Sequence, residues 1–276
     1  MIARPDTPFL LQFECSDAHD ALLFTTTRNG GVSQPPFDTF NLGNFSDDNP
    51  ADIAENRRHL SNTLGIKPNR LFIPKQVHGD RIVTIDDSFL SASVTEQTAL
   101  IEGCDALITN EPDICIGVTT ADCVPILLYD SQKRVAAAIH AGWRSTVQKI
   151  VVKTVEEMRR RFGVSSANLV AAIGPAIGQG AFEVGNEVVD AFREAGLLYQ
   201  TAHTRHPETG KAHLNLSEIN RLQLTDCGIK PENIETSGLC THTRGDLFFS
   251  ARRQGIRSGR MVTGVVIRQV TPSGTL

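Results

Sequence analysis

The sequence has 276 residues, of which 40% are hydrophobic and 21% are charged, and its formal net charge is -4. These proportions are typical of globular proteins and exclude disorder as a description of the whole chain, which is long enough to bury a substantial core. The small negative charge provides no general attraction to nucleic acid or to anionic membranes. We therefore expect neither of these partners and favour small molecules.

The start of the chain contains no apolar run of signal-peptide length, and no other stretch is long enough to span a bilayer. We therefore expect a cytoplasmic protein. The six cysteines are scattered and form no CxxC pair, which predicts reduced thiols and excludes a four-cysteine zinc ribbon. Any metal site must combine residues from distant parts of the chain.

Stretches rich in β-branched and aliphatic residues have the composition of strands. Several are continuous apolar runs, as is typical of strands covered on both faces. The predicted strands span residues 9–14, 22–27, 81–86, 114–119, 124–129, 135–139, 169–173 and 261–267.

Apolar side chains at helical spacing predict helices between these strands. The clearest covers residues 145–162, with an apolar stripe from Val147 to Phe162 and Ser145 or Thr146 as its N-cap. The other predicted helices span residues 51–64, 187–194 and 217–225. Since no repeat and no long Pro- or Gly-rich linker interrupts this pattern, we predict one α/β domain over residues 1–276, built on mixed sheets.

The helix at 51–64 carries a charge within its apolar face, because Arg57 shares that face with Ile53, Leu60 and Leu64. A buried guanidinium is costly unless it is paired. Arg57 therefore either forms an ion pair in the core or points into a cavity that accepts an anion. Asn41, in the preceding loop FNLGN, can contact a base or ribose through its amide, or can act as a turn residue.

A hairpin is predicted in TTADCVPILLYDSQKRVAAAIHAGWRST, where two strand-like runs flank turn-prone residues. With the turn centred between Ser131 and Gln132, antiparallel pairing places Cys123 opposite His140. Directly opposed side chains have Cβ atoms about 4.5 to 5.5 Å apart. The thiol and the imidazole would then be close enough to share a metal ion or a proton.

Two chemistries fit this pair. His140 can deprotonate Cys123 for attack on a carbonyl carbon, or both can bind zinc together with a third protein ligand, leaving one position open. The candidate third ligand is His78 in KQVHGD, on a turn where Gly79 permits a sharp bend. The alternative is a purely structural role for all three side chains, each satisfied within the core.

Arg144 lies in HAGWRST, at the start of the predicted 145–162 helix. Backbone N–H groups and the helix dipole favour anions at such a position, so Arg144 can bind phosphate there. It can equally lie in solvent, stacked on Trp143.

Several segments occur in an order found in a known family: RNGGVSQPPFDTFNLG, KQVHGD, CDALIT, TADCVPILLYD, HAGWRST, IGPAIGQGAFEVG and FFSARRQGIRSGR. In these segments the chain resembles the YfiH-type proteins, also called the laccase-domain or peptidoglycan editing factor family. The resemblance covers nearly the whole chain and is most specific in VHGD, ADC and HAGWR.

This resemblance implies a single-domain, layered α/β/β/α sandwich with mixed sheets, and a zinc site that matches His78, Cys123 and His140. It also implies phosphorolysis of adenosine, inosine, guanosine and methylthioadenosine, and deamination of adenosine. Bacterial members are further associated with removing L-serine from peptidoglycan precursors. An older label, multicopper polyphenol oxidase, fits less well, because the eight histidines are dispersed, so zinc is expected rather than copper.

The leading hypothesis is a zinc-dependent purine nucleoside phosphorylase with adenosine deaminase activity. In it, zinc polarises water or a substrate atom, Arg57 and Arg144 neutralise phosphate, and Asn41 contacts the substrate. A competing hypothesis is an amidohydrolase that acts on a muropeptide precursor through Cys123 and His140. The third is a zinc-stabilised nucleotide-binding protein without catalysis.

Overall fold

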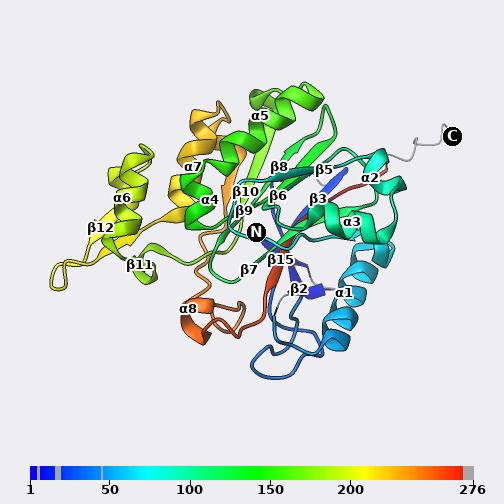
Figure 1. Ribbon diagram of the computed structural model, residues 1–276, viewed down its shortest axis with the longest axis horizontal. Helices are drawn as coiled ribbons and strands as arrows, with labels where there is room; N and C mark the ends of the chain where they lie inside the picture. Colours follow the sequence, from blue (N-terminus) through cyan, green and yellow to red (C-terminus); the bar gives the residue numbers. More distant parts are fainter. Residues whose placement is uncertain (5–6, 16–19, 45, 270–276) are drawn as a thin grey trace.

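The computed structural model describes residues 1–4, 7–15, 20–44 and 46–269. In this part of the chain, two six-stranded mixed sheets pack face to face and helices cover their outer faces (Figure 1). This is the layered α/β/β/α fold with mixed sheets that the resemblance implies. The division of the chain into a single domain over residues 1–276 stays a prediction.

Both large sheets combine parallel and antiparallel pairs, and a small antiparallel sheet projects with α6 from one side (Figure 1). The first sheet has the order β1 (Ile2–Arg4), β2 (Thr7–Gln12), β3 (Ala21–Thr26), β15 (Met261–Ile267), β7 (Cys115–Thr120), β4 (Leu71–Phe72). The second has the order β14 (Ile234–Thr236), β10 (Leu169–Ile173), β8 (Val124–Asp130), β9 (Val135–Ala141), β6 (Ala106–Thr109), β5 (Ile82–Ile85). The third has the order β11 (Glu183–Val184), β13 (Ala212–Leu214), β12 (His203–Arg205).

The helices of the described residues belong to the outer layers and the connections. In chain order they are α1 (Pro50–Leu64), α2 (Asp87–Ser91), α3 (Val94–Ile101), α4 (Trp143–Val147), α5 (Ile150–Phe162), α6 (Asn186–Glu194), α7 (Leu216–Asp226) and α8 (Ala251–Gln254). None of the helices in the described ranges combines the length and apolar character needed to cross a bilayer.

Strand β9 shows how the layers are assembled. Its odd-numbered residues, such as Ala137 and Ile139, pack with α5 and α7, whereas its even-numbered residues Ala136 and Ala138 face the first sheet. Both sets are buried because the strand lies between a helix layer and a sheet layer. His140 continues the even-numbered series, so its side chain points toward the space between the two sheets.

Every strand predicted from the sequence is present, with ends that differ by at most two residues. The predicted helices at 51–64, 187–194 and 217–225 correspond to α1, α6 and α7. The very short strands, together with α2, α3 and α8, were not predicted. The short strands, α2 and α8 contain too few residues for a period to be recognised.

The single helix predicted at 145–162 is wrong, because the chain forms α4 and α5 with a break between them. The break occurs at Lys149, which has a left-handed backbone with φ of 59°. Ser145 and Thr146, expected to cap the helix, are instead buried within α4, where Asn220 and Gln223 of α7 donate hydrogen bonds to Thr146. Packing of these polar groups against α7 therefore overrides a continuous apolar stripe.

The predicted register of the β8–β9 hairpin is also wrong by two residues. His140 pairs with Pro125, and Asp130 pairs with Val135, which leaves a four-residue connection over 131–134. The Asp130 carboxylate accepts the N–H groups of Gln132 and Lys133 and thereby stabilises this longer turn. Since a shift of two residues preserves the face of each side chain, Cys123 and His140 become diagonal neighbours on one face.

Leu127 lies on β8, is fully buried, and belongs to the core between the sheets. We expect Leu127→Ala to lower the free energy of unfolding by about 2 to 5 kcal/mol, because a cavity remains after the side chain is truncated. Urea denaturation followed by circular dichroism measures this loss. Leu100→Ala is the control, since Leu100 is 44% exposed; an equal loss in both variants would contradict this assignment of the core.

Candidate metal centre

Adjacent strands of the second sheet bring the candidate ligands to one end of that sheet. In the strand order β8-β9-β6-β5, both β8 and β6 run antiparallel to β9, and β5 runs parallel to β6. The first residues of β8, β6 and β5 therefore lie at the same edge of the sheet as the last residues of β9. Cys123 immediately precedes β8, His140 is near the end of β9, and Asp105 immediately precedes β6. His78 lies on the connection that leads into β5.

The side chains of His78, Cys123 and His140 converge at this edge. Their ligand atoms all lie within 4.8 Å of one another, and no second group of three or more His, Cys, Asp or Glu side chains in the described residues could hold a metal ion. The Cys123 Sγ is 3.8 Å from His78 Nε2. Ligand bond lengths typical of zinc place tetrahedral sulfur and nitrogen donors about 3.6 Å apart, so the separation of Cys123 and His78 is close to that of a zinc-bound pair.

Asp105 positions both histidines. Its Oδ1 accepts a hydrogen bond from His140 Nδ1 at 2.7 Å, which leaves Nε2 as the histidine atom available to a metal. The same carboxylate accepts the backbone N–H groups of Val77, His78 and Gly79 at 2.9 to 3.1 Å. His78, rather than Gly79, adopts the left-handed backbone of this turn, with φ of 60°, so the sharp bend expected at Gly79 occurs one residue earlier.

Cys123 and His140 favour opposite charges. Burial alone would raise the pKa of the Cys123 thiol, but the charge and hydrogen bond of His140, with a further contribution from His78, lower it well below the ordinary value. Burial alone would lower the pKa of His140, whereas Cys123 and Asp105 raise it. Burial likewise opposes ionisation of Asp105, but the hydrogen bond from His140 and those from backbone amides lower its pKa. The cysteine therefore favours the thiolate form that binds metals.

A pocket of about 370 Å³ opens in front of these ligands. Its walls include Arg260, whose guanidinium forms no ion pair among the described residues and donates hydrogen bonds to the Ser258 and Gly259 carbonyl groups. Burial lowers the pKa of Arg260, and the Cys123 charge acts in the opposite direction. Ile256 forms an apolar rim and is 86% exposed. The pocket thus combines metal ligands, one arginine and an apolar surface.

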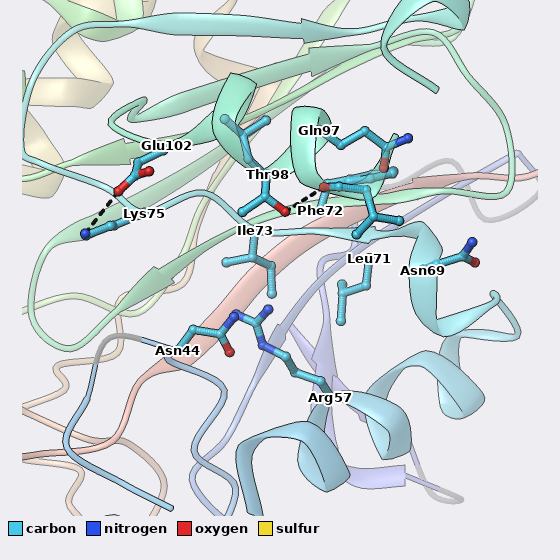
Figure 2. A pocket seen from close by; sticks show the side chains of 12 residues that line it. Asn44, Arg57, Asn69, Leu71, Phe72, Ile73, Lys75, Gln97, Thr98 and Glu102 are labelled. Atoms are coloured by element: carbon cyan, nitrogen blue, oxygen red, sulfur yellow. Dashed lines mark hydrogen bonds and ion pairs between the residues drawn. The ribbon is translucent and has the colours of Figure 1, made fainter. Parts of the chain in front are cut away.

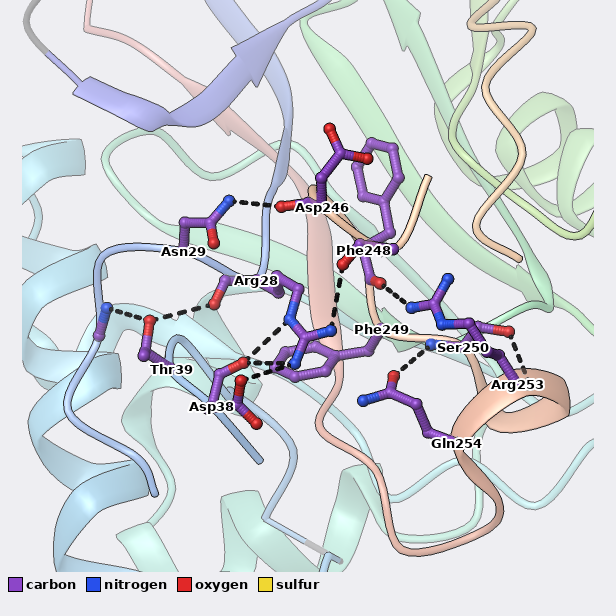
Figure 3. A network of polar contacts seen from close by, with 12 residues as sticks. Arg28, Asn29, Asp38, Thr39, Asp246, Phe248, Phe249, Ser250, Arg253 and Gln254 are labelled. Atoms are coloured by element: carbon purple, nitrogen blue, oxygen red, sulfur yellow. Dashed lines mark hydrogen bonds and ion pairs between the residues drawn. The ribbon is translucent and has the colours of Figure 1, made fainter. Parts of the chain in front are cut away.

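The wall that carries α8 is held by a polar network (Figure 3). Arg28 donates hydrogen bonds to the Asp38 and Gly245 carbonyl groups, forms an ion pair with Asp38, and lies 4.8 Å from the centre of the Phe249 ring. Arg253 donates to the carbonyl groups of Thr241, His242 and Phe248. These contacts fix the position of α8.

Asp122, which precedes Cys123, connects this wall to the candidate ligands. The Asp122 carboxylate accepts the backbone N–H of Arg252 and the hydroxyl of Thr241, each at 2.6 Å. Arg252 belongs to α8, whose first residue, Ala251, lines the pocket. The cysteine and the α8 wall are therefore held in a fixed relationship.

Asn41, predicted to contact the substrate, is fully buried and its amide is occupied by protein groups. Its Nδ2 donates to Ser46 and Asp48, and its Oδ1 accepts the N–H groups of Gly43 and Arg260. Gly43, Ser46 and Arg260 all line the pocket. The structure therefore shows Asn41 organising the pocket wall, and direct contact with a ligand stays a prediction.

The two arginines predicted to neutralise phosphate do not line the metal pocket. Arg57 lies in a different cleft and donates to the Leu42 carbonyl group. Arg144 is exposed on the five-residue helix α4, with its guanidinium 4.3 Å from the centre of the Trp143 ring. The structure brings together His78, Cys123 and His140 but leaves both arginines outside, and their roles in phosphate binding stay predictions.

Two residues of the site were missed by reasoning from the sequence. Asp105 stands directly before an apolar strand in CDALIT, and an acidic residue at the end of a buried strand was an available signal. Arg260 lies in the segment FFSARRQGIRSGR, where several arginines occur together and their order along the chain does not distinguish them. The pairing of β15 with β7 and the hydrogen bond from the Arg260 backbone N–H to Asn41 place Arg260, the residue before β15, beside the pocket.

Comparisons with known proteins show which family the chain belongs to. Residues 22–268 match the family model described as multi-copper polyphenol oxidoreductase laccase. A relative from Bacteroides thetaiotaomicron, named purine nucleoside phosphorylase, is 42% identical over 89% of this chain and 91% of its own length. Another, named adenosine deaminase RL5 and from an unknown prokaryotic organism, is 43% identical over 88% of this chain and 92% of its own.

A solved structure also shares the fold. The crystal structure of the hypothetical protein YfiH from Bacillus licheniformis superimposes with a TM-score of 0.87 and 32% sequence identity, covering 96% of this chain and 98% of that one. The similarity thus extends through both sheets and the helix layers.

Gly142 leaves the room that the ligands need. A Cβ atom at this position would lie 2.8 Å from His78 Cδ2 and 3.2 Å from Cys123 Sγ. We expect Gly142→Ala to displace these ligands and to weaken zinc affinity by about tenfold or more. Competition with a chromophoric chelator measures the affinity. Gly180→Ala is the control, because a Cβ there meets no atom within 4 Å; equal affinities in both variants would refute the steric argument.

Asp105→Asn tests the positioning of both histidines. The amide retains one acceptor oxygen, but its NH₂ group faces backbone donors, so part of the turn at residues 77–79 loses its partners. We expect zinc affinity to fall by about 10- to 100-fold with the fold retained, as measured by chelator competition and circular dichroism. Asp80→Asn, which alters a half-buried acid paired with Lys153, should leave the affinity unchanged.

Proposed function

This chain belongs to the family described as multi-copper polyphenol oxidoreductase laccases, the YfiH-type laccase-domain proteins, and on that premise we propose that it is a zinc-dependent purine nucleoside phosphorylase. Its proposed substrates are adenosine, inosine, guanosine and methylthioadenosine, together with phosphate, and adenosine deamination is a second proposed activity. The observation that carries the proposal is the convergence of His78, Cys123 and His140 beside one pocket.

The donor set supports zinc over copper. Two imidazoles and one thiolate with a position left open are typical of catalytic zinc sites. A multicopper centre requires further clustered ligands, and the described residues contain no second cluster that could supply them. When bound, zinc supplies Lewis-acid polarisation of water or of a substrate atom. His78, Cys123 and His140 would hold it, and Asp105 would keep His140 in the required orientation.

The other residues of the pocket suit a nucleoside and phosphate. The Arg260 guanidinium donates to the Ile256, Ser258 and Gly259 carbonyl groups and to the Ser258 hydroxyl, and none of these neutralises its charge, so it can pair with phosphate oxygens. In the proposed mechanism Arg260 therefore neutralises the phosphate at the metal, a role that the sequence assigned to Arg57 and Arg144. Ala121, Ala251 and Ile256 provide an apolar surface on which a purine base can lie. The charge that develops as the base leaves is then met by groups fixed in place before reaction.

The names of similar proteins support both proposed reactions. Relatives that are 42% and 33% identical are named purine nucleoside phosphorylases, from Bacteroides thetaiotaomicron and Bacillus subtilis. The relative named adenosine deaminase RL5 supports deamination. We place this activity in the same pocket, because it contains the one metal-binding group found in the described residues.

One observation favours a second candidate function. The lowered pKa of Cys123 and the raised pKa of His140 are also those of a nucleophilic cysteine with its general base. An amidohydrolase that removes L-serine from peptidoglycan precursors would use Cys123 to attack the amide carbonyl carbon and His140 to transfer the proton. Its substrate would be a muropeptide precursor.

The function is tested by combining metal analysis with an assay. We expect the purified protein to contain stoichiometric zinc and to convert inosine to hypoxanthine only when phosphate is present, and to release ammonia from adenosine. In His78→Ala both zinc and turnover should be lost, with kcat/KM reduced at least about a hundredfold, because Lewis-acid stabilisation contributes several kcal/mol. His206→Ala, at an exposed histidine of the projecting region, is the control.

Two results would oppose this function. Full zinc content and full nucleoside turnover in His78→Ala would remove the metal centre from the mechanism. An acyl adduct on Cys123 after incubation with a muropeptide precursor, without turnover of any nucleoside, would establish the amidohydrolase instead. Mass spectrometry of the intact protein detects such an adduct.

A further inference from the structure

A second cleft lies between α1 and α3, on the other side of the segments that form one wall of the metal pocket. Its volume is about 260 Å³, and its lining includes Asn44, Arg57 and Lys75 (Figure 2). Asn44 and Lys75 are adjacent in the chain to Gly43 and Gln76, which line the metal pocket. None of the three metal ligands lines this cleft, so it is a separate site.

Arg57 reaches into this cleft from α1 with one edge of its guanidinium already occupied. Nε and Nη2 both donate to the Leu42 carbonyl group, at 3.1 and 3.0 Å. Within the described residues, Nη1 has no hydrogen-bond partner and Arg57 forms no ion pair. Burial lowers the pKa of Arg57 to about 10, with no nearby acid acting against it. The guanidinium is therefore held in position but its charge is not neutralised.

The other two charged residues of the cleft, Lys75 and Glu102, neutralise each other. Lys75 and Glu102 form an ion pair at 3.1 Å, and about half of each side chain is exposed (Figure 2). This pair leaves Arg57 as the cleft residue whose positive charge is uncompensated. Burying an unpaired charge is unfavourable, and the free Nη1–Nη2 edge of a guanidinium matches the two oxygens of a carboxylate or phosphate group.

The remaining lining is apolar. Leu71 and Ile73 come from β4 and the segment that follows it, and Val94 at the start of α3 is 70% exposed. Figure 2 shows the side chains of Leu71 and Ile73 on the same side of the cleft as the Arg57 guanidinium. A ligand whose anionic group pairs with Arg57 can therefore place an apolar body against these side chains and remove their surface from water.

We propose that the cleft between α1 and α3 binds a small oxyanion with an apolar body, a carboxylate or a phosphate monoester, through an ion pair with Arg57. The site is independent of the metal centre and goes beyond the proposed nucleoside activity. The Asn44 amide, which lies beside the guanidinium (Figure 2), provides a further donor for the oxyanion.

Isothermal titration calorimetry with benzoate, phenyl phosphate and neutral benzyl alcohol tests this site. We expect at least one of the two anions to bind. Benzyl alcohol should bind at least about tenfold more weakly than that anion, since hydrogen bonds to charged groups contribute more than those between neutral groups. Comparison of benzoate with phenyl phosphate identifies which oxyanion is preferred. His78→Ala should bind the anion with unchanged affinity, because the cleft does not include the metal ligands.

A matched pair of variants on α3 separates ligand binding from folding. Thr98 lines the cleft, whereas Thr95 on the same helix does not, and both are exposed. Thr98→Glu places a carboxylate where the ligand would lie, so we expect anion affinity to fall about tenfold or more while Thr95→Glu retains it. Arg57→Met should also lose anion binding. This variant additionally loses the hydrogen bonds from Arg57 to the Leu42 carbonyl group, so Thr98→Glu is the decisive variant if Arg57→Met fails to fold.

Three results would overturn the proposal. They are absence of binding by both anions, equal anion affinity in Thr98→Glu and Thr95→Glu, and loss of binding in His78→Ala. The last result would assign the anion to the metal pocket.

Discussion

The candidate site depends on the hydrogen bonds that the Asp105 carboxylate accepts. It is fully buried, and it accepts hydrogen bonds from His140 and from three successive backbone amides around His78. A single acidic side chain therefore fixes two histidines that lie far apart in the sequence. The enclosed carboxylate is stabilised by these donors, so the candidate ligands are already oriented without a metal ion.

The second sheet brings this carboxylate and the candidate ligands together because its strands are not arranged in the order of the sequence. β6 lies between β9 and β5, so Asp105 stands between His140 and the turn that contains His78. Small residues then allow close approach: Gly142 leaves room beside Cys123 and His78, and Ala136 and Ala138 bring the two sheets together. A rigid layered fold thus supports a site formed mostly by connections at its edge.

Two arginines illustrate how charge is distributed around the site. Arg260 belongs to the wall of the candidate metal pocket, whereas Arg57 holds the Leu42 carbonyl group and reaches into a separate cleft. The helical pattern indicated that Arg57 lies in an apolar face and must meet either a carboxylate or an anion. The structure shows no carboxylate partner for it among the described residues, but it locates the cavity away from the metal.

Local patterns determined the longer strands and helices, since composition and period are properties of neighbouring residues. They also placed Cys123 and His140 on one face of a hairpin, although the turn formed by Asp130 shifted the register by two residues. Tertiary structure alone decided the break at Lys149, the contacts of Asp105, the place of Arg260 in the pocket wall, and the separation of Arg57 from the candidate metal site. These features depend on contacts between distant segments, which no local period records, and the resemblance to a known family was needed to join His78 to the pair.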